Sequence, residues 1–427
     1  MNERWQWLTL DDVLIQQANR KKVQQGWSPK CHDFPAATGA WGVLKTTAIQ
    51  AGRFEPEHNK ALPDHLDPKP GIEVESGDLL ITCAGPRSRC GVPTLVRSTP
   101  ERLMMSGKMY RFRADDRLDP RFLELWLLSP DAQRQIDAMK TGISDSGLNL
   151  THGRFTRLPV PVPPLAEQQR IADLLEDHLS RLDAADAYLE AAQRRGNLLH
   201  DQLLGSELAA VESAEIPLAE LLAVGLANGR SVPTEEGGFP VLRLTALRDG
   251  RIDLAERKPG AWTAADAKRF LVERGDFLIA RGNGSLRLVG RGGLVIDEPD
   301  AVAFPDTLIR ARPDLTRIDP EFLAYVWNAP GVRRQIEQAA KTTAGIYKVN
   351  QKDLAAVRVP VPTLADQERV TTAVRESRDA LSQLALEVDR AVARSSALRR
   401  SLLGAAFSGR LTGDASDLSE AEEMIGA

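Results

Sequence analysis

Residues 165–204 read LAEQQRIADLLEDHLSRLDAADAYLEAAQRRGNLLHDQLL, and residues 364–403 read LADQERVTTAVRESRDALSQLALEVDRAVARSSALRRSLL. Both stretches follow a Pro-Val-Pro segment, open with Leu-Ala-acid-Gln-x-Arg and lack an internal proline. They are rich in Ala, Leu, Glu, Gln and Arg, which favour helix. Each stretch therefore predicts a helix of 40 residues, roughly 60 Å long at ~1.5 Å per residue.

Apolar residues recur at spacings of four and three along both stretches, as in a coiled-coil seam. The first seam comprises Ile171, Leu175, His178, Leu182, Ala185, Leu189, Ala192, Gly196, Leu199 and Leu203. Adding 199 to each number gives the second: Val370, Val374, Ser377, Leu381, Leu384, Val388, Ala391, Ser395, Leu398 and Leu402. An exposed apolar stripe of this length needs a partner, so we expect an antiparallel coiled coil within one chain, with Leu381 opposite Leu182 or near it. The alternative is that each helix lies on its own domain.

The similarity between the two halves extends beyond the helices. Three further segment pairs match, at offsets of 198 to 200: 44–54 with 242–252, 77–85 with 275–283, and 118–136 with 318–336. A near-constant offset of this size indicates a tandem pair of domains rather than a solenoid of short repeats. We place a first domain at 1–160, its helix at 161–208, a second domain at 209–358, its helix at 359–412 and an acidic tail at 413–427.

Each domain is expected to mix helices and strands, an α/β (α+β) fold. A Leu-Lys/Arg-x-Thr strand comes early, and a Gly-Asp turn then leads into a short apolar strand at 79–82 or 277–280. Asp119 and Asp319, each followed by proline, predict the N-cap of a helix. The Pro/Val alternation before each long helix predicts an extended segment that cannot be central in a sheet.

Length and composition narrow the class of protein. A chain of 427 residues is too long for one core and predicts roughly two to four domains. No run of about 18 apolar residues occurs, and the N-terminus lacks the apolar core of a signal peptide. The cysteines Cys31, Cys83 and Cys90 suggest reduced thiols. We therefore expect a cytoplasmic protein with no membrane span.

The charge is unevenly distributed along the chain. The net charge of −4 becomes +1 once the five acidic residues after Gly413 are set aside. Between residues 82 and 113 seven basic residues accompany one acid, and between 279 and 296 three arginines accompany none. Such patches can bind phosphates. They can equally be solvated surface, and charge alone leaves both readings open.

The usual catalytic motifs are absent from the sequence. It contains no Gly-x-x-x-x-Gly-Lys-Ser/Thr phosphate loop and no complete dinucleotide-binding glycine motif. The six histidines and three cysteines show no metal-ligand spacing. Asp253, Glu256 and Lys258 loosely suggest a nuclease carboxylate–lysine set, but they crowd one polar loop without an equivalent in the first copy. We predict a chain that is not itself an enzyme and has no catalytic or metal-binding residues.

Two α/β units, each followed by Pro-x-Pro-x-Leu-Ala-Glu/Asp-Gln-x-Arg and a long helix, resemble the specificity subunits of type I restriction–modification enzymes. Residues 407–411 (Phe-Ser-Gly-Arg-Leu) also look like that family's conserved-region ending. The resemblance covers nearly the whole chain. One departure is that the family often has Ser-Arg-x-Gly after the Gly-Asp strand. The first copy has Thr82-Cys83-Ala84-Gly85 there, whereas the second keeps Arg281.

The resemblance implies a division of labour. Each variable domain would be a target-recognition domain reading one half of a split DNA sequence, and the helices would space the halves. Two methyltransferase subunits would dock on this chain, and restriction/translocase subunits would join the complex. The chain itself would bind no cofactor. Its partners would use S-adenosylmethionine, ATP and magnesium.

Candidate DNA contacts are selected by residue type and loop position, since Arg and Asn can read base edges while Lys and Thr more often hold phosphate. They are Lys45, Thr46, Arg87, Ser88, Arg89, Lys108 and Tyr110 in the first domain, and Arg243, Thr245, Arg281, Asn283, Arg287, Lys348 and Asn350 in the second. Two alternatives stay open. One is an interaction scaffold that binds DNA without sequence preference, and the other is an autonomous nuclease with an unrecognised carboxylate–metal site.

Overall fold

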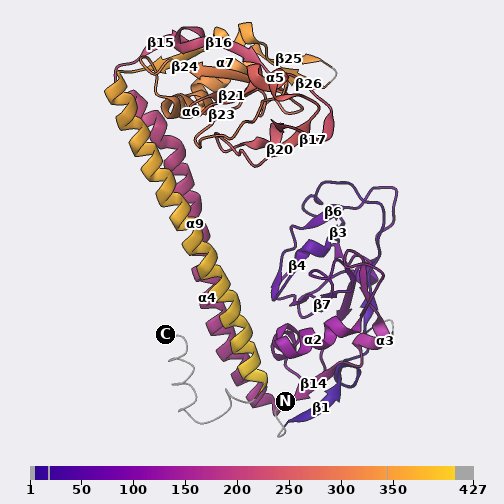
Figure 1. Cartoon of the computed structure of the whole chain (residues 1–427). Helices are drawn as coiled ribbons and strands as arrows, with labels where there is room; N and C mark the ends of the chain where they lie inside the picture. The colour runs from indigo at the N-terminus through magenta and orange to yellow at the C-terminus, as the bar shows by residue number, and fades with distance from the viewer. Residues whose placement is uncertain (1–4, 18–19, 344, 409–427) are drawn as a thin grey trace. The chain divides into compact units, whose positions relative to one another are not determined.

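A computed structural model describes residues 5–17, 20–343 and 345–408 (Figure 1). The chain divides into two compact units: Met1–Leu189 together with Asp389–Ala427, and Glu190–Val388. Among the described residues, no helix is both long enough and apolar enough to cross a membrane. The proposed acidic tail and most of the Phe-Ser-Gly-Arg-Leu ending lie outside the described residues.

The first unit is built around a four-stranded sheet with strand order β2-β11-β7-β9. All four residues of β7 are buried because both faces of the sheet are covered. Leu79 and Ile81 face the core that contains Phe122, and Leu80 faces a second core that contains Val43. The elements of this domain are β1 Gln6–Thr9, the 3-10 helix η1 Leu10–Val13, β2 Gln24–Gln25, β3 Gly42–Leu44, η2 Thr46–Ala48, β4 Ile49–Gln50, β5 Arg53–Phe54, β6 Asn59–Ala61, η3 Pro70–Ile72, β7 Leu79–Thr82, β8 Ala84–Gly85, β9 Pro93–Leu95, β10 Leu103–Met104, β11 Met109–Phe112, α1 Pro120–Leu128, α2 Pro130–Met139, β12 Lys140–Thr141, β13 Leu148–Leu150, α3 His152–Phe155 and β14 Pro159–Val162.

The second unit repeats this plan with a six-stranded sheet of order β16-β24-β21-β23-β19-β18. Its central strand β21 is again buried on both faces, with Phe277 and Ile279 in one core and Leu278 in the other. The elements of this domain are β15 Ala214–Pro217, η4 Leu218–Leu221, β16 Leu222–Asn228, β17 Thr234–Leu242, η5 Leu244–Ala246, β18 Leu247–Arg248, β19 Arg251–Ile252, β20 Arg257–Gly260, α5 Ala264–Ala267, η6 Lys268–Phe270, β21 Phe277–Ala280, β22 Gly282–Asn283, β23 Gly292–Leu294, β24 Leu308–Pro313, α6 Pro320–Asn328, α7 Pro330–Ala339, β25 Lys341–Thr343, β26 Ile346–Lys348, α8 Gln351–Ala355 and β27 Arg358–Val361.

The Gly-Asp motif before β7 and β21 is a buried electrostatic anchor. Asp78 is fully buried, caps the backbone N–H of Glu75 at 2.8 Å and accepts from Arg113 Nε at 2.6 Å. Asp276 is held in the same way, with two hydrogen bonds from Arg312 at 2.7 and 2.9 Å. The glycine before each aspartate has a φ of +89°, a conformation that favours glycine. The predicted turn and strand are confirmed in both units.

Both Asp-Pro helices begin where the sequence predicts. Asp119 accepts from the N–H of Arg121 at 2.8 Å, and Asp319 from the N–H of Phe322 at 2.7 Å, so each carboxylate caps its helix. A second helix, α2 or α7, follows each of them at once. The predicted Leu-Lys/Arg-x-Thr strand is shorter than expected. β3 ends at Leu44, and Thr46 opens a 3-10 turn instead.

The long helices are α4 Leu165–Ala209 and α9 Leu364–Phe407. Each unit contains one half of each helix, and within each unit the two halves lie side by side (Figure 1). In the first unit, Ser395 Oγ in the second half of α9 donates to Asp186 Oδ2 near the middle of α4 at 3.0 Å. In the second, Arg369 near the start of α9 binds Glu207 near the end of α4 at 2.7 Å. The pairing is antiparallel, as expected.

The seam follows the predicted heptad at one end of α4 and departs from it at the other. Ile171 and Leu175 are buried, but Leu199 is 68% exposed, and His200 turns inward to Ser377 at 3.0 Å. In a straight helix, positions seven residues apart are rotated by ~20° relative to one another. Leu199 lies four heptads beyond Ile171, so the accumulated rotation turns it away from the partner helix. Leu199 is thus wrong as a seam residue, and Ala185 is exposed as well.

Other apolar seam positions of the two helices are buried or half-buried, among them Leu182, Leu189, Val370, Val374, Leu381, Val388 and Leu398. The expected neighbour of Leu182 was wrong. Leu182 and Leu398 both pack against the core of the first unit, whereas Leu381 faces Gly196. A Cβ atom at Gly196 would lie 2.7 Å from Leu381 Cδ2. Because Gly196 has no side chain, it leaves room for Leu381 across the seam.

Each domain core is completed by the end of the other copy's helix. Phe407 is buried at the end of α9, with its ring centroid 5.2 Å from those of both Phe122 and Trp126. At the equivalent end of α4, Leu208 packs against the core of the second unit. The alternative of a helix lying on its own domain is also partly realised, because Ile171 and Val370 are buried in the cores of their own units.

The glutamine of the Leu-Ala-acid-Gln motif fixes the start of each long helix. Gln168 is fully buried and accepts from the N–H of Asp119 at 2.8 Å, while its amide donates to the carbonyls of Arg117 and Pro163. Gln367 makes the same three bonds in the second unit. Only a side chain with both a donor and an acceptor can satisfy these groups. The motif is therefore a structural joint.

An ion pair of reversed polarity joins the first helix of each domain to its long helix. In the first unit Arg121 binds Asp173 at 2.7 Å and Glu176 at 3.1 Å. The equivalent positions in the second unit carry Glu321 and Arg375, which lie 2.5 Å apart. The geometry is therefore kept while both charges are exchanged.

Candidate nucleic-acid interface

A short ribbon of three strands follows the central strand of each domain. In the first unit its order is β12-β13-β8, and in the second β22-β26-β25. Each ribbon continues directly from the buried strand that the Gly-Asp anchor holds. Its middle strand comes from a hairpin far along the chain. Each ribbon and the loop beside it carry several of the candidate DNA contacts. These are Arg87, Ser88 and Arg89 in the first domain, and Arg281, Asn283, Arg287 and Lys348 in the second.

Loop residues beside the first ribbon are held by internal bonds. The guanidinium of Arg87 binds Asp137 at 2.7 Å and Asp145 at 3.1 Å, and these carboxylates raise the pKa of Arg87. Lys140 shares Asp137 at 2.9 Å and is almost wholly buried. The positive charges expected to face phosphate here are already neutralised within the protein.

Arg89 is a brace rather than a surface group. It donates to Gln50 Oε1 at 3.0 Å and to the carbonyls of Thr46 and Ile49 at 2.5 and 2.6 Å. These bonds hold the 3-10 turn η2 and the start of β4. Arg89 is half-buried and donates to three acceptors, so it has an internal role in this structure. The carbonyl of Thr46 is one of these acceptors.

Tyr110 also lies inside the first domain. It is 6% exposed, and its hydroxyl donates to the carbonyl of Leu150 at 3.0 Å. Burial, with the neighbouring Cys83, raises the pKa of Tyr110 to about 12. Lys45, Ser88 and Lys108 are exposed, as a DNA contact requires.

The second ribbon and its loop present cations without carboxylate partners. Arg281 is half-buried, and Arg287, Arg291 and Lys348 are exposed. None of the four makes an ion pair among the described residues. The backbone of Arg281 is fixed by its N–H donated to Thr307 and by its carbonyl, which accepts from Val349, at 2.9 and 3.0 Å. Positive charge is thus held at defined positions but left free to meet an anion.

Three of the other candidates in this unit have local roles as well. Asn283 Oδ1 accepts from the N–H of Ser285 at 3.0 Å and shapes the loop, and Asn350 caps α8 through the N–H of Asp353 at 2.9 Å. Thr245 donates to Glu256 at 3.0 Å. Arg243 is exposed. A cleft of about 750 Å³ in this unit is lined in part by Asn283 and Arg291, together with His200 of α4.

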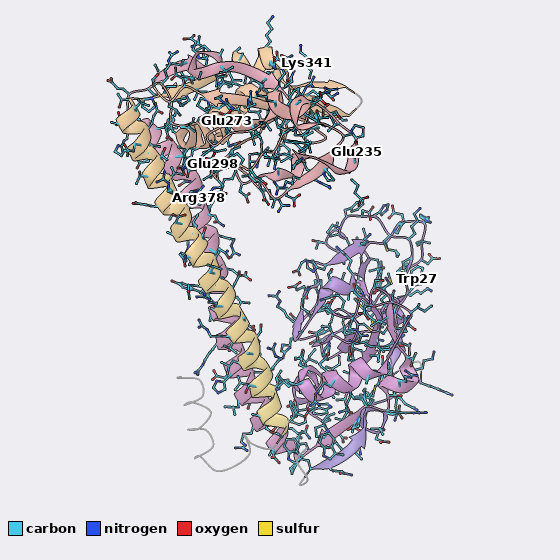
Figure 2. The ribbon with its side chains drawn as sticks, viewed as in Figure 1. Trp27, Glu235, Glu273, Glu298, Lys341 and Arg378 are labelled. Atoms are coloured by element: carbon cyan, nitrogen blue, oxygen red, sulfur yellow. The ribbon has the colours of Figure 1, made fainter. Side chains whose placement is uncertain are left out.

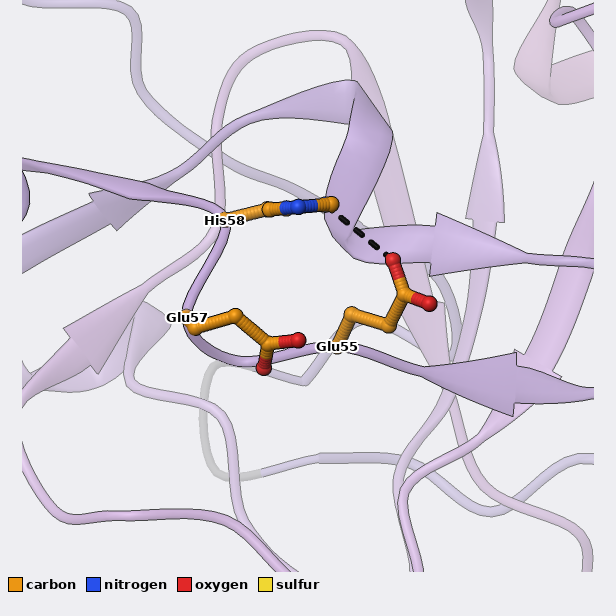
Figure 3. A group of neighbouring side chains, drawn as sticks. All are labelled: Glu55, Glu57 and His58. Atoms are coloured by element: carbon orange, nitrogen blue, oxygen red, sulfur yellow. Dashed lines mark ion pairs between the residues drawn. The ribbon is translucent and has the colours of Figure 1, made fainter. Parts of the chain in front are cut away.

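A group of metal-ligand type lies in the first domain, beside β5. Glu55, Glu57 and His58 bring their ligand atoms within 4.8 Å of one another (Figure 3). His58 Nδ1 lies 3.1 Å from Glu55 and 2.9 Å from the carbonyl of Thr47, and Glu55 also pairs with Arg53. These contacts engage two of the three groups and brace a loop. The spacing of histidines and cysteines in the sequence did not point to this group.

The two buried cysteines of the first domain offer no reactive thiolate. Cys83 and Cys90 are buried, and burial raises the pKa of both thiols, that of Cys83 to about 12. Asp253, Glu256 and Lys258 do not converge either. Glu256 holds Thr245, and Lys258 donates to the carbonyl of Val232 at 2.9 Å.

Comparison with known proteins extends this picture. Residues 48–187 match the type I restriction modification DNA specificity domain. The chain is 26% identical to the type I restriction enzyme EcoKI specificity subunit of Escherichia coli K12 over 390 residues, 87% of this chain and 82% of that one. Over most of its length the chain is therefore similar to type I restriction enzyme specificity subunits. It is also 34% identical to the EcoEI specificity subunit of Escherichia coli over 206 residues, although that match spans only 34% of the relative's length.

Two solved structures share the fold of this chain. One is a chain from a structure that addresses complex assembly and conformational transition of the type I R-M system. It aligns with this chain with a TM-score of 0.68 at 19% identity, and the alignment covers 95% of this chain and 98% of that one. The HsdS subunit from Thermoanaerobacter tengcongensis aligns with a TM-score of 0.52 at 20% identity, covering 95% and 97%. The two-domain, two-helix architecture expected from the sequence is confirmed.

Sequence reasoning missed Lys341, a cation of the second unit's ribbon, and counted Arg291 in a basic run without choosing it as a DNA contact. Lys341 lies on β25 directly opposite Lys348, and it is labelled in Figure 2. A hairpin signal was present, because Gly345 separates two short runs. The register that brings the two lysines together, however, depends on pairing that only the structure defines.

Proposed function

We propose that this chain is the DNA-recognition subunit of a type I restriction–modification complex, and that it reads a split, asymmetric target. Each α/β domain would read one half-site. One observation carries the proposal: two domains of one scaffold, with equivalent Gly-Asp anchors and glutamine joints, present ribbons of different chemistry. Duplicated readers with unequal surfaces suit two unequal half-sites, whose spacing follows the protein's geometry.

The chain would act by positioning other subunits, not by chemistry of its own. The metal-ligand group of Glu55, Glu57 and His58 lies in a loop of the first domain, where Glu55 and His58 already bind neighbouring groups. Two methyltransferase subunits would dock on the helices and domains, and restriction/translocase subunits would join them. S-adenosylmethionine, ATP and magnesium would then be cofactors of those partners. A cytoplasmic location follows from this role.

A base-modification map of the host genome, with and without the gene, tests the proposal. We expect methylation to be lost at one motif made of two short half-sites with a fixed gap. Replacing residues 9–157 with the corresponding domain of another family member should then change one half-site and leave the other. A change in both halves, or in neither, would contradict modular reading.

The competing function is an interaction scaffold that binds DNA without sequence preference. The free cations of the second unit favour this alternative to some degree, since they can bind any phosphate backbone. It predicts binding that depends steeply on salt and is indifferent to sequence. Selection of bound duplexes from a random pool decides between the two, because a scaffold would enrich no motif.

A further inference from the structure

The two ribbons place different residues at equivalent positions of the same row. In the first unit, Asn149 on the middle strand pairs with Ala84 on one side and Thr141 on the other. Thr141 Oγ1 also donates to the carbonyl of Asn149 at 3.2 Å. Residues directly opposite in antiparallel strands share one face of the sheet. This row is therefore polar, neutral and bonded within itself.

The same row in the second unit is positively charged. Lys348 on the middle strand pairs with Gly282 on one side and Lys341 on the other. Both lysines are exposed, and neither makes an ion pair among the described residues. Like charges directly opposite each other destabilise a sheet. An unbalanced pair of this kind is relieved when an anion binds between the two ammonium groups.

The surroundings of the row add charge and space. Gly282 carries no side chain, and a Cβ atom placed on it would meet the Cγ of Lys348 at 3.4 Å, so the lysine stem lies across the glycine. Arg281 directly precedes Gly282 in the chain, between β21 and β22, and its backbone is fixed by two hydrogen bonds. The ribbon thus places two compact cations side by side, one of them over a residue without a side chain, and lysine is suited to holding phosphate as a point charge.

We propose that the row of Gly282, Lys348 and Lys341 holds the phosphate backbone of the DNA, and that the equivalent row of the first unit does not. The second domain then binds the phosphate backbone without regard to sequence, in addition to reading bases. The first domain would bind DNA through its other exposed groups. This inference rests on the proposed function, and it assigns a chemical role to one surface of it.

The test is a pair of row exchanges in the full chain. Lys341→Thr with Lys348→Asn gives the second unit the neutral row of the first. Binding of a random-sequence duplex and of the selected target duplex is measured across a salt series. Each lost phosphate contact lowers the slope of log K against log salt by ~0.9, so we expect the slope to become shallower by about 1.8. Affinity should fall about fivefold per contact near physiological salt, equally for both duplexes.

Two controls define the outcome. Lys268→Gln removes an exposed lysine elsewhere in the second unit and should leave the slope unchanged. Thr141→Lys with Asn149→Lys should steepen the slope by adding the grip to the first unit. The Lys341/Lys348 variant should melt no lower than the parent, because a like-charge pair is removed.

The results separate this inference from the proposed function. An unchanged slope in the Lys341/Lys348 variant, with target selection intact in the parent, overturns the phosphate role alone. A changed target preference would show that the lysines read bases, which also overturns it. Absence of any selected motif in the parent would refute the proposed function whatever the lysines do.

Discussion

The two units differ least where they are buried and most where they meet solvent beside the ribbon. In the first unit, Arg87, Arg89 and Lys140 all bind acceptors of the protein itself. In the second, Arg281 and Lys348 are without carboxylate partners among the described residues. In one copy of the scaffold the cations beside the ribbon are bound by acceptors of the protein itself, and in the other copy they have no carboxylate partner among the described residues. Charge counted along the sequence did not distinguish them, because partners decide whether a cation is available.

The largest expected effect tests the shared part of the comparison. Gln168→Leu and Gln367→Leu should each destabilise their unit by about 3 kcal/mol, because each leaves one N–H and two carbonyls buried without partners. The measurement is chemical denaturation of each variant. Gln169→Leu, at the exposed neighbouring position, is the matched control and should be close to neutral. Clearly unequal costs in the two units would break the claim of one scaffold.

A second pair of variants tests the differing part. Arg89→Ala should lower stability by about 1–2 kcal/mol, since three acceptors and a packed side chain lose their partner. Arg287→Ala, in the second unit's loop, should leave the melting temperature unchanged and weaken DNA binding. Thermal melts and binding isotherms on the same samples measure both. If Arg287→Ala destabilised the chain while Arg89→Ala did not, the assignment of internal and external roles would be reversed.

The reversed ion pair predicts a smaller effect. Arg121→Glu places a third carboxylate beside Asp173 and Glu176 and should cost about 1 kcal/mol, a modest value because the groups are partly exposed. Adding Glu176→Arg to it reproduces the polarity of the second unit and should restore much of the loss. Denaturation of the two single variants and the double variant gives the coupling. Additive losses would mean that the pair contributes nothing specific.

The smallest effect concerns pH. Burial alone would raise the pKa of Glu321, but hydrogen bonds from Arg375 and Tyr325 outweigh it and hold the pKa below the ordinary glutamate value. A depressed carboxyl pKa gives stability that is present above the ordinary value and is lost as pH falls through the folded-state value. Glu321→Gln should therefore flatten the acid side of the stability curve by less than about 1 kcal/mol. An unaltered curve would argue against the contribution of this pair.

Much of the fold could be predicted because it depends on local signals. Asp-Pro caps and Gly-Asp turns act within a few residues and are confirmed, and the repeated heptad is confirmed over part of its length. The seam failed at Leu199, where a small angular error had accumulated along a straight helix. Site roles were harder to predict, since Arg89 and Tyr110 look like surface chemistry in sequence but are satisfied by residues far away along the chain. Lys341 was missed because its significance lies in strand register.

The exchange of charge between Arg121–Glu176 and Glu321–Arg375 bears on how a chain of two near-copies sorts its own parts. The two long helices have similar seams and the same glutamine joint, so each could dock on the wrong domain while the chain folds. A misplaced α9 would bring Arg375 against Arg121, and a misplaced α4 would bring Glu176 against Glu321. Like charges in these positions penalise both errors at once. The exchanged charges thus favour the pairing of the first domain with the start of α4 and of the second domain with the start of α9.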